Sequence, residues 1–158
     1  MKEDPMYRLI YKSRGTEPIT WSTLDSIVET SLVNNLNNSI GGFLLCTETS
    51  YLQVLEGTSK HLNTTFSRIM KDPRHTDVEL IAYHEIEKRM FDHWEMRTIG
   101  VFDFNNLAKT ILINKYGAEN GQVRFPDTEW QVLAMIYDIH HSEEIPEWNK
   151  DRKTEATP

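Results

Sequence analysis

The sequence predicts an α+β protein, a ferredoxin-like sandwich with two helices on one sheet face, followed by a C-terminal extension of two helices. Three observations support this prediction. Short segments rich in β-forming residues alternate with amphipathic segments in the order β-α-β-β-α-β-β. Asparagine, glycine and proline clusters separate these segments. After residue 102 the pattern changes to two further segments with helical periodicity.

The first strand is expected at residues 7–12, where β-forming residues alternate in type, and Gly15 and Pro18 end it. Thr20 is expected to cap a helix that runs to about residue 33. A hairpin, a second helix capped by Ser59 and two more strands follow. Their expected positions are residues 40–46, 51–57, 59–71, 78–86 and 94–101.

The segment Tyr51-Leu52-Gln53-Val54-Leu55-Glu56-Gly57 is an apolar predicted strand with an amide at its centre. Burying that amide costs roughly 1–3 kcal/mol unless it is hydrogen-bonded, so Gln53 needs a partner. In this fold the first strand lies beside the third, and we expect Tyr7 to face Gln53. An amide has a donor end and an acceptor end, so it can act as a switch. On spacing alone, a pair that only satisfies a polar core group is the simpler interpretation.

The C-terminal segments are expected to form helices at residues 107–116 and 127–141. The second segment is apolar over most of its circumference, so it must pack on the free sheet face or on a second chain. Residues 142–158 are polar and are expected to be disordered. We therefore expect one domain at residues 1–102, a helical extension at residues 103–141 and a tail at residues 142–158.

Composition excludes several classes of function. The 158 residues carry a net charge of −7, which disfavours nucleic-acid binding because phosphate contacts need a basic surface. A single cysteine, Cys46, is typical of a reducing compartment, and no signal peptide or membrane-spanning run is apparent. A soluble, cytoplasmic protein is expected. The pair His140-His141 is interpreted as a solvated helix end, so no metal site is expected.

Six motifs together resemble the BLUF family of blue-light sensors that use flavin, over roughly residues 5–101. The motifs are Tyr7-Arg8-Leu9-Ile10-Tyr11, Asn34-Asn35, Ile40-Gly41-Gly42-Phe43-Leu44-Leu45, Leu52-Gln53-Val54-Leu55-Glu56-Gly57, Asp72-Pro73-Arg74-His75 and Phe91-x-x-Trp94-x-Met96. One departure is Ser39-Ile40-Gly41-Gly42, where family members usually read Gly-Ile-Thr-Gly. No effector domain is apparent, so the chain looks like a short BLUF protein.

The resemblance implies roles for individual residues. Tyr7 would be the tyrosine that donates an electron to excited flavin, and Gln53 the amide that switches, with Met96 and Trp94 as its exchangeable neighbours. Asn34 and Asn35 would contact the flavin ring, and the ring would lie between helices. The remaining implied cofactor contacts are Leu24, Ile27, Phe66, Arg68, Arg74 and His75.

The resemblance also implies a function. The chain would be a non-enzymatic photoreceptor that binds flavin non-covalently, FAD first, with FMN or riboflavin as alternatives. Its signal would pass through the C-terminal helices to an unidentified protein partner or to a dimer interface. Two other hypotheses stay open: a small ferredoxin-like enzyme that uses Arg74, His75 and nearby carboxylates, and a scaffold without cofactor that only dimerises.

Overall fold

The computed structural model describes residues 4–27, 29, 40–90 and 96–141. Its central element is a five-stranded sheet in the order β4-β1-β3-β2-β5. Neighbouring strands are antiparallel, except that β5 runs parallel to β2. This is the predicted ferredoxin-like arrangement, with β1 between β3 and β4. The strands are β1 Met6–Gly15, β2 Gly41–Cys46, β3 Ser50–Thr58, β4 His75–Ile86 and β5 Met96–Gly100.

Two helical segments belong to one face of the sheet. Residues 21–27 form the first, and the hydroxyl of Thr20 accepts a hydrogen bond from the Thr23 amide at 3.5 Å, as expected of a cap. The second is α2, Ser59–Met70. Its cap is Thr58 rather than the expected Ser59, because the Thr58 hydroxyl is the group that accepts from the His61 amide.

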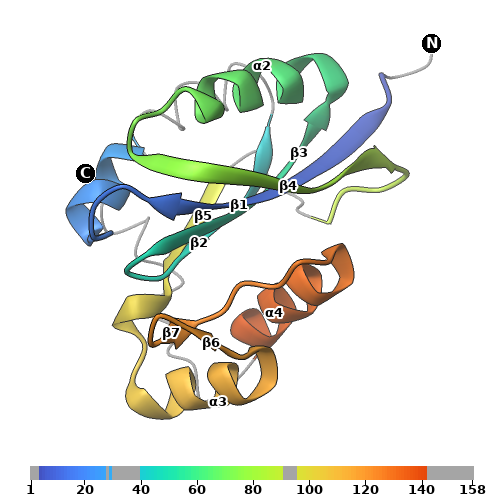
Figure 1. The fold of residues 1–158 in the computed structure, drawn as a ribbon. Helices are drawn as coiled ribbons and strands as arrows, with labels where there is room; N and C mark the ends of the chain where they lie inside the picture. Colours follow the sequence, from blue (N-terminus) through green and yellow to red (C-terminus); the bar gives the residue numbers. More distant parts are fainter. Residues whose placement is uncertain (1–3, 28, 30–39, 91–95, 142–158) are drawn as a thin grey trace.

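The C-terminal helices cover the other face of the sheet (Figure 1). They are α3, Asn106–Tyr116, and α4, Glu129–His141, joined by the two-stranded hairpin β6, Ala118–Glu119, and β7, Gln122–Val123. The short 3-10 helix η1, Val101–Asp103, leads from β5 towards α3. The two predicted helices are therefore confirmed in position.

Each face of the sheet has its own apolar core. On the α4 face, Val132, Met135 and Ile139 pack in one cluster with Ile10 and Val54 of the sheet. The apolar side of α4 therefore packs on the free sheet face within this chain, the first of the two alternatives that the sequence left open. Helix α4 also leaves Trp130 and Tyr137 71% and 63% exposed. Among the described residues, no helix combines the length and hydrophobicity needed to cross a bilayer.

A glycine sets the spacing of strands around the centre of the sheet. Gly42 has φ of +156°, and a Cβ atom added there would lie 1.8 Å from the carbonyl oxygen of Val54. Any side chain would push β2 away from β3. Gly42 lies opposite Leu55 on β3 and Met96, the first residue of β5.

Candidate functional site: a buried tyrosine–glutamine pair

Gln53 lies near the centre of β3 and is only 5% exposed to solvent. The register places it directly opposite Tyr11 of β1 on one side and Leu44 of β2 on the other. Directly paired residues in a sheet point to the same face. Tyr11 and Leu44 belong to the cluster that packs under the residue 21–27 helix and α2, so Gln53 faces the same helical layer.

The hydroxyl of Tyr11 donates a hydrogen bond to Oε1 of Gln53 inside the protein. Burial raises the pKa of Tyr11, with smaller contributions from Asp72 and Tyr51. Tyr11 therefore stays a neutral phenol and can act as the donor. This fixes the orientation of the amide, because its carbonyl oxygen points to the phenol and its N–H donors lie at the other end.

The structure contradicts the expected contact between Tyr7 and Gln53. Tyr7 lies opposite Gly57, roughly 13 Å along the strand from the Gln53 position at about 3.3 Å per residue. Its ring stacks on Tyr83 of β4 with centroids 5.2 Å apart. Tyr7 and Tyr11 share a strand face, so the alternation did not distinguish them. Only the register identifies Tyr11, the residue that sequence reasoning missed.

Apolar side chains from the helices cover this polar pair. The Phe66 ring lies 5.5 Å from the Tyr11 ring, Leu24 is fully buried, and Ile27 packs against the same cluster. On the same face, the Thr98 hydroxyl is buried and has no hydrogen-bond partner within the described part of the chain. Apolar walls with a few buried polar groups are the pattern of a pocket for a flat ring with one polar edge. The residues present therefore fit a flavin.

The basic residues predicted to line the cofactor are spread along this layer. Arg68 is exposed and its Nη2 lies 3.5 Å from the Thr65 hydroxyl. Arg74 makes a bidentate contact with Asp72, its Nε lying 2.9 Å from Oδ1 and its Nη2 2.5 Å from Oδ2. Partial burial opposes ionisation of Asp72, but hydrogen bonds from Arg74 outweigh it and lower its pKa. His75 lies beside the ring of Tyr11.

Asn34, Asn35 and Trp94 lie outside the described residues. The backbone of Met96 pairs with Gly42, next to the strand that carries Gln53.

The opposite face of the sheet carries an ion network that connects the strands to α4. Glu56 of β3 is fully buried, and its Oε2 lies 2.9 Å from Nη2 of Arg8 on β1. Another nitrogen of the same guanidinium, Nη1, lies 3.0 Å from Glu129 in the first turn of α4. His84 of β4 contacts the same Glu129 carboxylate at 2.7 Å.

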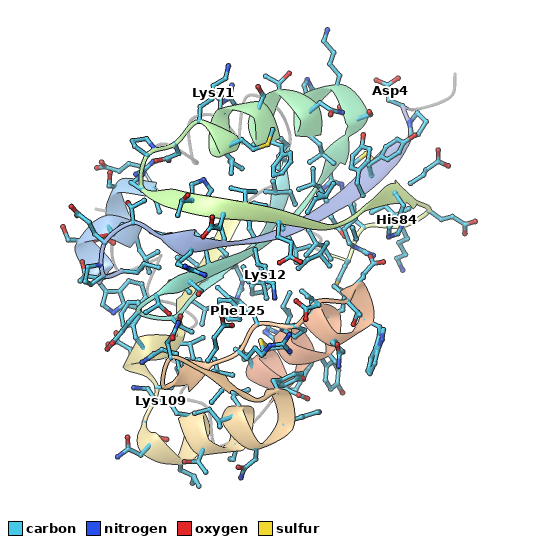
Figure 2. All side chains as sticks on the ribbon, in the orientation of Figure 1. Asp4, Lys12, Lys71, His84, Lys109 and Phe125 are labelled. Carbon is cyan, nitrogen blue, oxygen red and sulfur yellow. The ribbon has the colours of Figure 1, made fainter. Side chains whose placement is uncertain are left out.

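Two further contacts extend this connection. The amide of Met90, in the loop after β4, donates to Oε1 of Glu56 at 3.0 Å. The Lys12 ammonium contacts Asp127 and donates to the carbonyl of Phe125 at 3.2 Å. Figure 2 labels Lys12 and Phe125, which lie where the sheet meets the C-terminal segment. Polar contacts thus hold the start of α4 on the face opposite to Gln53.

The fold and site together define a ferredoxin-like domain in which a buried tyrosine–glutamine pair faces two helical segments. The family model described as "BLUF: Sensors of blue-light using FAD" matches residues 6–97, more than half of the chain. The chain belongs to the BLUF family of flavin-binding blue-light sensors. The expected family, fold and cofactor class are therefore confirmed.

Individual relatives agree with this assignment. Over 97 residues the chain is 32% identical to photoactivated adenylate cyclase subunit alpha of Euglena gracilis, covering 60% of this chain and 10% of that protein. It therefore spans about a tenth of the length of that curated relative. The dark-state structure of BlrB, a BLUF protein, has a TM-score of 0.62 at 22% identity, covering 96% of this chain and 98% of BlrB. Ground-state BlsA has a TM-score of 0.68 at 23% identity, covering 87% and 89%. At these identities both structures support the fold alone.

Proposed function

We propose that this chain is a blue-light receptor in which Tyr11 and Gln53 form the switch. The observation that carries the proposal is the buried hydrogen bond from the Tyr11 hydroxyl to Oε1 of Gln53, covered by Phe66 and Leu24. Flavin absorbs blue light and, when excited, is an oxidant strong enough to take an electron from a phenol. Tyr11 replaces Tyr7 in this role, because Tyr7 lies opposite Gly57.

The proposed cycle leaves no net chemical change in the protein. Tyr11 would give up one electron to the excited flavin, and its phenolic proton would move along the hydrogen bond to Oε1 of Gln53. Return of the electron to Tyr11, together with one proton from Gln53, would restore the neutral phenol. Because the two ends of the amide have nearly the same shape but opposite polarity, Gln53 can settle in a rotated or imidic form. The changed hydrogen bonds of Gln53 are then the signal, so the chain acts as a sensor and not as an enzyme.

Other predicted residues keep supporting roles in this proposal. Leu24, Ile27 and Phe66 form the apolar wall, Asn34 and Asn35 address the polar edge of the ring, and Trp94 and Met96 respond to Gln53. FAD is the proposed flavin, in line with the family description, and FMN and riboflavin are the alternatives. Arg68 and Arg74 are proposed to lie near the side arm of the flavin.

The output is proposed to leave through the C-terminal helices. Residues 1–102 would sense light, and residues 103–141 would pass the change to a protein partner or a second copy. The contacts of Arg8 with Glu56 and Glu129 support this route, since β3 carries Gln53 on one face and Glu56 on the other. Hydrogen exchange of α4 that is identical in light and dark would count against it.

The enzyme hypothesis has less support. It requires an arginine and a histidine available to a substrate, but Arg74 is engaged with Asp72, and both ring nitrogens of His75 contact the protein.

Absorption spectroscopy tests the proposed function. Purified protein should be yellow and should show a small reversible red shift under blue light, and extraction of the pigment against flavin standards identifies the cofactor. Gln53→Leu should keep the colour and lose the shift, because leucine fills the same space without an amide. A colourless protein that added flavin cannot restore would refute the proposal.

A further inference from the structure

His75, the first residue of β4, uses both ring nitrogens to connect three elements of the fold. Nδ1 lies 2.7 Å from the hydroxyl of Ser13 on β1. Nε2 lies 2.6 Å from the carbonyl oxygen of Ile69 in α2. Because a carbonyl can only accept, Nε2 must carry a hydrogen, and in the neutral ring Nδ1 accepts from Ser13. The ring is therefore fixed by one strand and one helix.

The fixed ring packs against Tyr11. The centroids of the two rings are 6.1 Å apart with an interplanar angle of 66°, and His75 meets Tyr51 in the same way at 6.0 Å and 89°. Edge-to-face contacts of this kind restrict how an aromatic ring can turn. Phe66 contacts Tyr11 from α2. The phenol that donates to Gln53 is thus held between two rings.

This geometry differs from the role that the family resemblance implied for His75. A histidine whose two nitrogens both contact protein groups does not present a hydrogen bond to a cofactor. We propose instead that His75 is a positioning residue for Tyr11, and that the Ser13–His75–Ile69 connection sets how long the light-induced arrangement of Tyr11 and Gln53 persists.

The physical reason is the mobility of the phenol. Reversal of the switch requires Tyr11 and Gln53 to exchange one hydrogen-bond arrangement for another inside a close-packed layer. A phenol held by a fixed neighbour reorganises slowly, whereas a loosened neighbour gives the pair more room. Removing a bond to His75 should therefore speed recovery by about two- to tenfold, the range that one neutral hydrogen bond can supply. The lifetime part of this inference rests on the proposed function.

The experiment compares dark-recovery rates after a blue-light pulse in four variants. Ser13→Ala removes only the Nδ1 contact, and His75→Phe keeps a ring but removes both contacts. His75→Gln can donate and accept again, so it should recover more slowly than His75→Phe. Ser26→Ala is the control, because it removes a hydroxyl that contacts Arg74 at 3.1 Å, whereas the ring nitrogens of His75 contact Ser13 and Ile69. We expect Ser13→Ala and His75→Phe to keep their flavin and red shift and to recover faster, and Ser26→Ala to match the wild type.

A second measurement does not depend on light. Nuclear magnetic resonance of ring-labelled tyrosine in the dark reports how fast the Tyr11 ring flips, which should rise in Ser13→Ala and not in Ser26→Ala. An unchanged flip rate and recovery rate in Ser13→Ala would overturn the inference, even if His75→Phe failed to fold. Loss of flavin from a folded His75→Phe would also overturn it, because His75 would then be a cofactor contact. If the wild type showed no photoresponse but the Tyr11 ring flipped faster in Ser13→Ala, the photoreceptor proposal and the lifetime effect would be refuted. The positioning role of His75 would still be supported.

Discussion

Replacing Arg8 is predicted to lower the free energy of unfolding substantially, although the side chain lies near the surface. Its guanidinium lies 2.9 Å from the carboxylate of Glu56, which has a side-chain exposure of 0% against 11% for Arg8. Arg8→Met keeps the length and the apolar stem of the side chain but leaves a buried carboxylate without this cation. Removing one partner of a buried ion pair costs about 3–5 kcal/mol. We expect a loss of about that size in the free energy of unfolding.

Urea unfolding followed by circular dichroism measures this loss. One control variant and one double variant show whether it comes from the buried ion pair. Arg14→Met removes an arginine that is 62% exposed and 3.6 Å from Asp77, so it should cost less than about 1 kcal/mol. Arg8→Met combined with Glu56→Gln should recover much of the loss, because the glutamine is neutral and can still accept from the Met90 amide. If Arg8→Met were as stable as Arg14→Met, the network would contribute little and the reasoning would fail.

Two further predictions concern pH and backbone geometry. The hydrogen bond with Glu129 raises the pKa of His84, so this contact should stabilise the fold fully below the ordinary value of 6.5 and lose its effect as pH rises through the folded-state pKa. The stability difference between wild type and His84→Gln should therefore shrink as pH rises from below 6.5 through the raised folded-state pKa, and a difference that grows with pH would contradict the assignment. Because His84 is exposed, less than about 1 kcal/mol is expected. Gly42→Ala should yield little folded protein, whereas Gly121→Ala, with open space around it, should lower the free energy of unfolding by only about 1 kcal/mol. Circular dichroism and thermal melts of both purified variants measure this, and a folded Gly42→Ala that melts at the same temperature as Gly121→Ala would refute the close approach of β2 and β3.

The sequence predicted the order and type of the elements because periodicity records which face of each segment is buried. Helix α4 shows this well: its apolar circumference required a partner, and the sheet face that holds Ile10 and Val54 is that partner. Alternation did not say which face of β3 carries Gln53. The cluster that contains its neighbours Tyr11 and Leu44 shows that this is the helical face.

Alternation could not predict the register in which β1 pairs with β3. Tyr7 and Tyr11 have the same parity on β1, and the pairing with β3 decides which phenol reaches the amide. The same limitation applies to His75 and Arg74, whose partners come from β1, from α2 and from the turn before β4. The Arg8–Glu129 contact joins residues 121 positions apart in the sequence, and no local pattern predicts such a pair.

The most direct test of the switch compares Tyr11→Phe with Tyr7→Phe by light-minus-dark absorption spectroscopy. Both variants remove a phenolic hydroxyl from the same face of β1, but only Tyr11 donates to Gln53. We predict that Tyr11→Phe binds flavin and shows no light-induced red shift, while Tyr7→Phe responds as the wild type does. A normal photoresponse in Tyr11→Phe, or its loss in Tyr7→Phe alone, would contradict the proposed switch.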